Sequence, residues 1–449
     1  MALLSLPPEI VEKICEFFCS HCQTEPLSHF FHEQTLITPS PDQIWEHDAE
    51  GAETLVNLSK TCQALKTLTL PHLYHRTRPE RHITDALEFS VYSQDHGLEV
   101  LKFARSLSLT DTMVRRDNGG YRFDAALKMM PNIQLLHLTF YLFNCERTLF
   151  KSARLESLRY VHIEGLDLDP ATGEPRNLAQ KYADLFKQAP RIDTLVIRVD
   201  GLSWSSRSMG LGNVRCLKLV NTCVSQRDLS FLVGSCPQLE RFVFIVRGKT
   251  MTGHEMDRGY ATLQTLPQIL SLRRDTLRYL EVYCRYRPRY RVALAARNAI
   301  MSSLKDLINL ETIVLGGQTS PFKVDETRQP PKYCLVDLLP PSIRSVSIES
   351  THQNLYEPMC VLAEAIRSGS FTKLKEVRQY NFDMERAFRL AQYEALNNDT
   401  SRKTEGLGQR NNFDEEKIFF HDMLLELSKG CNVSFSVCEE KLFIRDPLA

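Results

Sequence analysis

The sequence has no excess of charge of either sign and no long run of apolar residues. Lysine plus arginine and aspartate plus glutamate both number 55, so the formal net charge is zero. A neutral chain has no overall field that would draw it onto nucleic acid or an anionic membrane, and any recognition by charge must come from local patches. No stretch approaches the roughly 18 apolar residues of a membrane-spanning helix, so no membrane partner is expected.

The sequence also lacks the motifs that carry common enzyme chemistry. No glycine-rich phosphate loop follows a candidate strand, because Gly210-Leu211-Gly212 has no third glycine, and this argues against a doubly wound nucleotide-binding fold. The segment from His29 to Glu33 does not have the spacing of a zinc metalloprotease, and no catalytic triad is visible. We therefore predict a protein that is not an enzyme and that needs no cofactor.

The cysteines do not suggest a disulfide framework. They number 13 in a chain of 449 residues, whereas disulfide frameworks belong to short secreted proteins with paired cysteines. The apolar run at the N-terminus is too short for a signal peptide and has no basic flank. We expect reduced thiols and a cytoplasmic or nuclear location.

Cysteine and histidine are densest near the N-terminus. The members of this group are Cys15, Cys19, His21, Cys22, His29 and His32. Zinc takes thiolate and imidazole ligands, but the spacing of this set is not that of a known zinc finger. Three of the cysteines fall on one helical stripe, where cysteine behaves as a small apolar residue. The prediction is therefore no metal site, and metal binding by this set is the alternative.

Internal repetition is the main signal in the rest of the chain. An apolar pattern of the form Leu-x-x-Leu-x-Leu recurs at intervals of roughly 20–40 residues, around the range of leucine-rich repeats. The clear copies are Ile133, Leu136, Leu138; Leu158, Val161, Ile163; Ile192, Leu195, Ile197; Val214, Leu217, Leu219; Leu239, Phe242, Phe244; Leu277, Leu280, Val282; Leu310, Ile313, Leu315; and Ile343, Val346, Ile348. Weaker copies occur near Leu107 and Val377.

Stretches with a helical period lie between these copies, at 177–188, 293–308 and 357–368. One strand and one helix cannot bury their apolar faces alone, but stacked neighbours build a continuous core. The predicted fold class is α/β: a helical module at 1–78 with a polar insertion at about 20–52, then a leucine-rich-repeat solenoid at 79–449. Its curved parallel sheet lies inside and its helices outside, with a mobile loop at about 397–412.

The N-terminal module shows apolar residues at helical spacing in two segments. The first has Pro7 and Pro8 in its first turn, followed by apolar Ile10, Ile14 and Phe17. These segments resemble the F-box, in the form common in fungal F-box proteins. The matching residues are Leu6-Pro7-Pro8-Glu9-Ile10, Ile14, Phe17 and Phe18, then Leu55 through Leu65, and Leu73-Tyr74. The insertion between the halves is longer than the connection usual in that family.

The resemblance implies that the module binds the Skp adaptor of Skp–cullin–F-box ubiquitin ligases, and through it a cullin. The repeats would then select the protein to be ubiquitinated, without supplying a catalytic residue. The residues expected to contact the adaptor form an apolar edge made of Leu6, Pro7, Pro8, Ile10, Ile14, Leu58 and Leu65. The alternative is a leucine-rich-repeat scaffold outside ubiquitination, which uses the same helices for another partner.

The expected target site is the concave face of the sheet. Residues between the apolar positions of a strand point to the opposite face. This set mixes aromatic, basic and apolar side chains: His137, His162, Arg198, Lys218, Val243, Tyr283, Arg285, Arg378 and Tyr380. Aromatic residues and arginine are enriched at protein interfaces, so an unidentified protein target is expected.

The segment 285–291 alternates arginine with tyrosine or proline. We interpret it first as a solvated loop. An acidic or phosphorylated protein partner is the next candidate, because arginine pairs well with phosphate. An arginine-dependent nucleic-acid binder is the least favoured reading, since the chain as a whole is not basic.

Overall fold

The computed structural model of the chain describes residues 6–19, 22, 49–77, 99–110, 127–139, 150, 154–165, 177–199, 201–205, 211–247, 261–285, 301–317, 334–349, 356–380 and 433–438. Most of the predicted insertion at 20–52, the predicted loop at 397–412 and the arginine-rich segment after residue 285 lie outside them. The chain divides into two compact units, Met1–Leu217 with Ser235–Gln238 and Leu442–Ala449, and Lys218–Gly234 with Leu239–Lys441.

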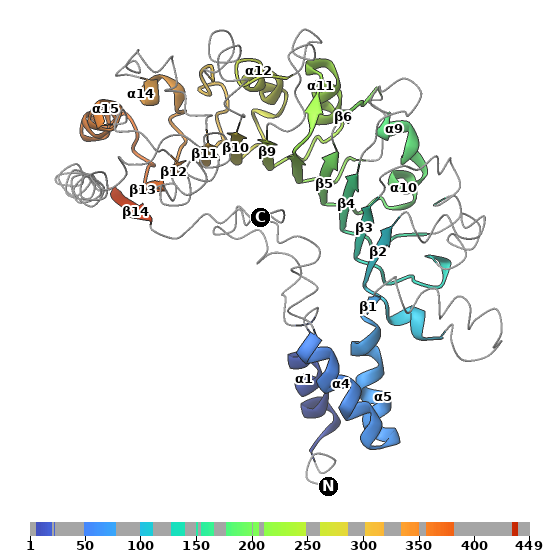
Figure 1. Cartoon of the computed structure of the whole chain (residues 1–449). Helices are drawn as coiled ribbons and strands as arrows, with labels where there is room; N and C mark the ends of the chain where they lie inside the picture. Colours follow the sequence, from blue (N-terminus) through green and yellow to red (C-terminus); the bar gives the residue numbers. More distant parts are fainter. Residues whose placement is uncertain are drawn as a thin grey trace, which may run out of the picture. The chain divides into compact units, whose positions relative to one another are not determined.

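The first unit begins with a module of three described helices, which we call the helical module: α1 (Pro8–Phe18), α4 (Ala49–Thr61) and α5 (Gln63–Tyr74) (Figure 1). Helix α1 begins at a proline, as predicted, because the first turn needs no backbone donor there. The sulfur of Cys62 caps α5 by accepting from the amide of Leu65 at 3.5 Å. The buried core of the module is small and consists of Val11, Cys15, Cys19, Leu55 and Leu65.

Strands and short helices alternate through the remainder of the described chain. In the first unit they are β1 (Arg76–Thr77), η3 (Glu99–Phe103), β2 (Ser106–Thr110), β3 (Leu135–Thr139), β4 (Tyr160–Gly165), α9 (Leu178–Lys181), α10 (Ala183–Gln188), β5 (Thr194–Val199) and β6 (Gly201–Leu202). Strand β7 (Cys216–Val220) lies at the division between the units. The second unit contains β8 (Cys223–Val224), α11 (Gln226–Gly234), β9 (Arg241–Arg247), α12 (Leu266–Leu270), η5 (Ser271–Arg273), β10 (Tyr279–Arg285), β11 (Thr312–Gly317), α14 (Cys334–Leu338), β12 (Ser345–Glu349), α15 (Tyr356–Arg367), β13 (Glu376–Tyr380) and β14 (Ser434–Cys438).

The strands form parallel sheets in which each repeat adds one strand. Their order is β1-β2-β3-β4-β5 in the first unit and β9-β10-β11-β12-β13-β14 in the second. Each neighbouring pair in these two orders is parallel and in register, so that Leu136 lies beside Val161 and Leu280 beside Ile313. In each unit the helices that connect successive strands lie on one side of the strands (Figure 1). The predicted stack of strand-and-helix repeats, typical of leucine-rich repeats, is confirmed.

The apolar repeat pattern forms the core in both units. Its positions are almost completely buried, as at Leu195 and Ile197 in β5 or Leu280 and Val282 in β10. Helical side chains such as Phe186 are equally buried. The register of the pattern is therefore confirmed, because a slip by one residue would have exposed these side chains.

Side-chain amides connect the turns of neighbouring repeats. An asparagine comes directly before the first apolar position of a repeat at residues 132, 213 and 309. The amide nitrogen of Asn132 donates to the carbonyl oxygen of Lys102 at 2.8 Å, that of Asn213 to Pro190 at 2.7 Å, and that of Asn309 to Asp275 at 2.9 Å. Each bond ties the turn of one repeat to the neighbouring repeat, and so helps to fix the spacing of the repeats.

The helices between the strands are shorter than the periodicity suggests. The predicted helix at 177–188 breaks at Tyr182 into α9 and α10. The predicted helix at 293–308 is wrong over its described part, because 301–308 contains only turns and irregular chain. Helix α15 confirms the prediction at 357–368 and ends where Gly369 adopts a φ of 86°, which favours glycine. Among the described residues, no helix has both the length and the apolar character needed to cross a membrane.

We expect a core substitution within one repeat to destabilise the fold strongly. Leu195→Ala in β5 removes a side chain that is 0% exposed, and large-to-small changes at such sites cost about 2–5 kcal/mol of unfolding free energy. Chemical denaturation of the full chain measures the change. Lys187→Ala, at an exposed position of α10, is the matched control and should leave the transition within about 0.5 kcal/mol of wild type. Equal stability of Leu195→Ala and wild type would contradict the repeat register.

Candidate functional site

Polar side chains gather on the sheet face that alternates with the apolar repeat positions. In the first unit, one group spans four neighbouring strands, and we call it the histidine–glutamate cluster: Ser108, His137, Thr139, His162, Glu164 and Arg198. In the second unit, a group that we call the lysine–glutamate cluster contains Lys218, Arg241, Tyr279 and Glu281. A third group, the terminal cluster, contains Ser345, Glu376 and Arg378.

The histidine–glutamate cluster is a continuous hydrogen-bonded network. His137 and His162 are register partners whose rings stack with centroids 4.5 Å apart. The Nδ1 of His137 lies 3.1 Å from the hydroxyl of Ser108, and its Nε2 lies 3.4 Å from the Oε2 of Glu164. The other oxygen of Glu164 forms an ion pair with the guanidinium of Arg198 at 3.0 Å. The carboxylate therefore has a partner on both sides.

The charge on Glu164 is stabilised by these partners. Burial alone would raise the pKa of this carboxyl, but the hydrogen bond to His137 and the nearby charge of Arg198 outweigh it, so the pKa lies below its usual value. Ligand atoms of His137, His162 and Glu164 lie close enough together to surround a metal ion. However, the guanidinium of Arg198 already neutralises that carboxylate, which disfavours a second cation there.

In the lysine–glutamate cluster, the carboxyl of Glu281 is more strongly desolvated than that of Glu164. Glu281 is only 6% exposed and accepts from the hydroxyl of Tyr279 at 2.9 Å. Burial raises its pKa, and the attraction of Lys218 and the bond from Tyr279 offset this only in part. The guanidinium of Arg241 lies over the ring of Tyr279, 4.3 Å from the centroid, as a cation–π contact. The Oε1 of Glu281 has no hydrogen-bond partner among the described residues.

The terminal cluster combines a carboxylate with a bidentate donor. Arg378 donates from Nε and from a terminal nitrogen to the Oε2 of Glu376, at 3.0 and 2.7 Å. The other oxygen of Glu376 accepts from the hydroxyl of Ser345 at 2.6 Å. About a quarter of the side chain of Arg378 remains exposed, at 25%.

The predicted target-binding residues occupy the predicted face but are mostly not exposed. His137, His162, Lys218, Val243 and Tyr283 are 5%, 8%, 6%, 5% and 2% exposed, so the prediction that alternation exposes them is wrong. The reason is that parallel strands lie only about 4.8 Å apart, so equivalent side chains cover one another.

Two of the predicted arginines remain accessible on this face. The side chain of Arg198 is 31% exposed and that of Arg378 is 25% exposed. The side chains of Arg285 and Tyr380 lie outside the described residues. Sequence reasoning missed Glu164 and Glu281, although the same alternation places them on this face, because it selected only aromatic, basic and apolar side chains.

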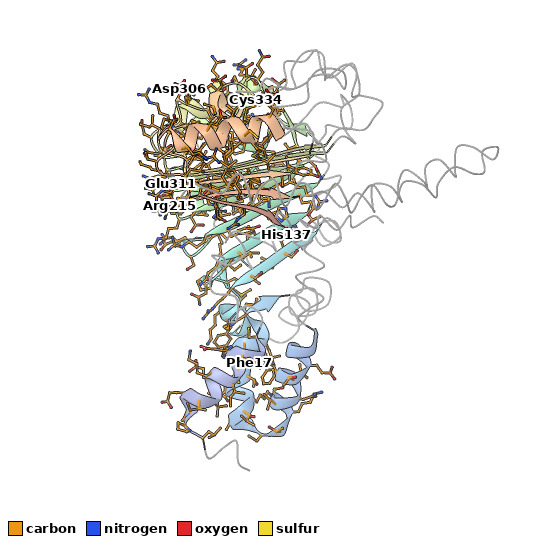
Figure 2. The ribbon with its side chains drawn as sticks, turned by 90° about the vertical axis from the view of Figure 1, so that its left-hand side faces the viewer. Phe17, His137, Arg215, Asp306, Glu311 and Cys334 are labelled. Atoms are coloured by element: carbon orange, nitrogen blue, oxygen red, sulfur yellow. The ribbon has the colours of Figure 1, made fainter. Side chains whose placement is uncertain are left out.

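The predicted adaptor edge is exposed over α1. Leu6 and Ile10 are 38% and 47% exposed, and Pro7 and Pro8 are also exposed. Phe17 is 68% exposed, although it was not among the expected contacts. Its side chain lies on the outside of the helical module (Figure 2).

The other residues of the predicted edge, Ile14, Leu58 and Leu65, are less exposed. Ile14 and Leu58 are half-buried. Leu65 is 4% exposed and packs in the core of the helical module, so it does not lie on the exposed edge. It faces inward because it lies on the side of α5 that packs against the other two helices.

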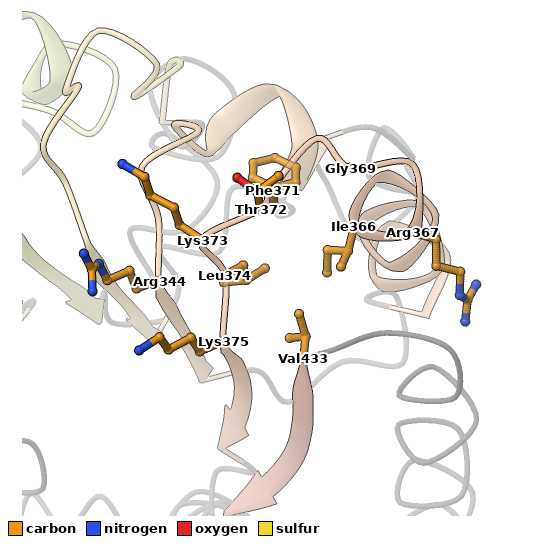
Figure 3. A pocket seen from close by; sticks show the side chains of 10 residues that line it. All are labelled: Arg344, Ile366, Arg367, Gly369, Phe371, Thr372, Lys373, Leu374, Lys375 and Val433. Atoms are coloured by element: carbon orange, nitrogen blue, oxygen red, sulfur yellow. The ribbon is translucent and has the colours of Figure 1, made fainter.

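A pocket of about 620 Å³ lies beside α15 and the start of β13, in the second unit. Its lining includes four basic residues, Arg344, Arg367, Lys373 and Lys375. In Figure 3 the apolar side chains of the lining converge on the hollow, whereas the charged ends of these four point outward. Ligand pockets usually have a few polar groups that converge inside, so this hollow is a packing gap with a basic rim.

Comparison with known proteins adds little to this description. No family model matches the chain, and no curated protein matches it. Among solved structures, an internalin (inlF) from Listeria monocytogenes is similar with a TM-score of 0.29 at 13% sequence identity, over 68% of this chain and 91% of the internalin chain. The fold assignment therefore rests on the strand order and register of this chain itself.

We expect the network around Glu164 to make stability depend on pH. Its pKa is lowered in the folded state, so its contribution is fully present above the unfolded pKa of about 4.3 and is lost as the pH falls through the folded pKa. Glu164→Gln should lower the free energy of unfolding by about 1.5–3 kcal/mol at neutral pH. The difference from wild type should shrink in acid, where both side chains are neutral.

Denaturation curves at several pH values measure this difference. Glu156→Gln, at an exposed position before the same strand β4, is the matched control and should have little effect at any pH. A deficit of Glu164→Gln that stays constant from neutral to acidic pH would show that the ionised network does not stabilise the fold.

Proposed function

We propose that the chain is the substrate-recognition subunit of a Skp–cullin–F-box ubiquitin ligase. The helical module would bind the Skp adaptor, and the parallel sheet of the repeats would bind a protein target. The single observation that carries the proposal is the exposed apolar surface of α1, formed by Leu6, Ile10 and Phe17, on helices whose sequence resembles an F-box.

The apolar surface of α1 suits a partner because the helical module does not cover it. Leu6, Ile10 and Phe17 are three of the five large apolar residues that stand exposed in the described chain. Clustered exposed apolar side chains mark sites of protein association. Within the same helix, Val11 and Cys15 are buried and hold α1 on its neighbours. One side of α1 therefore stabilises the helical module while the other is available for docking.

The polar face of the sheet suits recognition of a protein target. In the histidine–glutamate cluster, Ser108, His137 and Glu164 hold each other in fixed positions, so little side-chain entropy is lost on binding. Arg198 stands at the accessible end of that network. In the terminal cluster of the second unit, Arg378 also keeps an accessible side chain, at 25% exposed. The accessible arginines favour a target with an acidic segment.

In this role the chain contributes proximity and supplies no catalytic group. Holding a target near a ubiquitin-charged enzyme on another subunit converts an encounter between free molecules into a reaction within one assembly. The proposal therefore assigns no enzymatic activity to the chain alone.

We predict that Ile10→Asp abolishes co-purification of a Skp-type adaptor with the full chain. The substitution places a charge at a position that is 47% exposed, so the helical module should still fold, but docking would bury that charge without a partner. Losing one central anchor commonly costs about 2 kcal/mol or more of binding energy.

The matched control for this experiment is Lys66→Asp, an equally drastic change at an exposed position of α5, which should still capture the adaptor. Circular dichroism of both variants checks the helix content. If folded Ile10→Asp retains the adaptor as well as Lys66→Asp does, the F-box assignment is wrong. If the wild-type chain captures a different complex or RNase-sensitive material, the scaffold or the nucleic-acid alternative replaces it.

A second prediction concerns the target. Arg198→Gln keeps a polar, hydrogen-bonding side chain but shortens it and removes the charge, and glutamine avoids the repulsion that an acidic residue would meet beside Glu164. We expect a subset of the co-purifying proteins to be lost while the adaptor is retained. Quantitative mass spectrometry of the captured material measures this.

Arg215→Gln, at an exposed position before β7 (Figure 2), is the control and should retain the same proteins as wild type. If Arg198→Gln and Arg215→Gln capture identical sets, the polar face of the first unit does not select the target.

A further inference from the structure

Two cysteines and two histidines converge at one end of the helical module. Cys19 is the residue that ends α1, and the amide of Cys22 donates to the carbonyl of Cys19 at 2.9 Å. His72 lies in the last turn of α5, and His75 is the residue that ends that helix. The spacing of three residues in each pair places both members on the same side of their segment.

The ligand atoms of these four side chains all lie within 4.8 Å of one another. The Sγ of Cys22 is 3.3 Å from the Nδ1 of His75 and 3.5 Å from the Nδ1 of His72. The Sγ of Cys19 is 3.7 Å from the Nδ1 of His75. Zinc bonds of about 2.3 Å to sulfur and about 2.0–2.1 Å to nitrogen, at tetrahedral angles, require sulfur–nitrogen separations of about 3.5 Å. The observed separations bracket that value.

We propose that Cys19, Cys22, His72 and His75 form a structural zinc site that joins the ends of α1 and α5. Four protein ligands complete a tetrahedral shell and leave no position open for substrate, which is typical of structural zinc. Two sulfurs with two imidazoles select zinc over magnesium or calcium, which prefer oxygen ligands.

Burial supports a metal ion over a set of ordinary hydrogen bonds. Cys19, His72 and His75 are 5%, 7% and 4% exposed, and buried polar groups need partners. The Cys19 thiol lies 3.7 Å from the carbonyl oxygen of His72, and the imidazoles of His72 and His75 both face the sulfur of Cys22, with His75 also facing that of Cys19. A central cation satisfies all four side chains at once.

The position of the site gives the ion a structural task. The core of the helical module contains few buried residues, and small units commonly need a metal or a disulfide in addition to their core. The carbonyl oxygen of His75 accepts from the amides of Arg105 and Ser106, at 2.8 and 2.9 Å. The zinc site therefore fastens α1 not only to α5 but also to the first strands of the repeats.

The sequence contains one visible part of this signal, the Cys-x-x-Cys spacing of Cys19 and Cys22. Sequence reasoning grouped these cysteines with nearby histidines and overlooked His72 and His75, which come about fifty residues later in the chain. Only the packing of α5 against α1 brings the two pairs together (Figure 1). The site is independent of the proposed ligase function, because it concerns the stability of the helical module whatever partner that module binds.

The test is a metal analysis of the full chain, purified without chelators from cells grown with added zinc. We expect one zinc ion per chain by elemental mass spectrometry. After exchange with cobalt(II), we expect the intense visible bands of tetrahedral cobalt and a thiolate charge-transfer band in the near ultraviolet. Cys22→Ser should lose both the zinc and these bands. A chelator should lower the melting temperature of wild type but not that of Cys22→Ser.

The matched control is Cys15→Ala, one helical turn before Cys19 and buried in the same core, which should keep its zinc. The cobalt spectrum of wild type decides the question even if Cys22→Ser fails to fold. The proposal is overturned if wild type carries no more zinc than Cys22→Ser, if its cobalt spectrum is octahedral, or if a folded Cys15→Ala loses the metal as completely as Cys22→Ser.

Discussion

The structure depends on the burial of one apolar pattern between successive repeats. A single repeat offers only a strand of five to seven residues in most cases and a short helix, which cannot exclude water by themselves. The apolar positions of β5 and β10 are nevertheless almost fully buried, because the neighbouring strands and helices on both sides cover them. Every other feature of the sheet follows from this stacking, including the parallel order and the shared register.

The same close stacking determines the character of the opposite face. Side chains in equivalent positions of adjacent strands touch, so a polar residue there is desolvated by its neighbours and needs a partner. The partners of His137 are Glu164 and Ser108, and the partner of Glu281 is Tyr279. The resulting networks are rigid, and a partner protein would meet the outer groups, such as Arg198, at positions that the buried groups hold in place.

The helical module has few buried side chains, and residues 19–48 separate α1 from α4 and α5 in the sequence. Its outer apolar surface, with Ile10 and Phe17, adds nothing to the stability of the free module. The ends of α1 and α5 lie beside each other and carry the group of Cys19, Cys22, His72 and His75. The proposed zinc site would hold the two helix ends together. The module could then stay folded although its outer apolar surface is left uncovered for a partner.

The sequence by itself determined the repeat architecture, the register and the helical module. These follow from spacing alone: the positions of Leu195 and Ile197 predict which face of β5 is buried, and the residues around Ile10 predict an amphipathic helix. Helix lengths were less well predicted, as at Tyr182, because short helices end where packing against the sheet ends.

Only the tertiary structure decided which polar residues are exposed to solvent and which polar side chains contact one another. Alternation places His137 and Lys218 on the expected face, but their burial depends on side chains of neighbouring strands that are distant in the sequence. The four groups at the ends of α1 and α5 are likewise separated by 50 to 56 residues. A local pattern fixes the direction of a side chain, whereas its surroundings are fixed by contacts that only the folded chain creates.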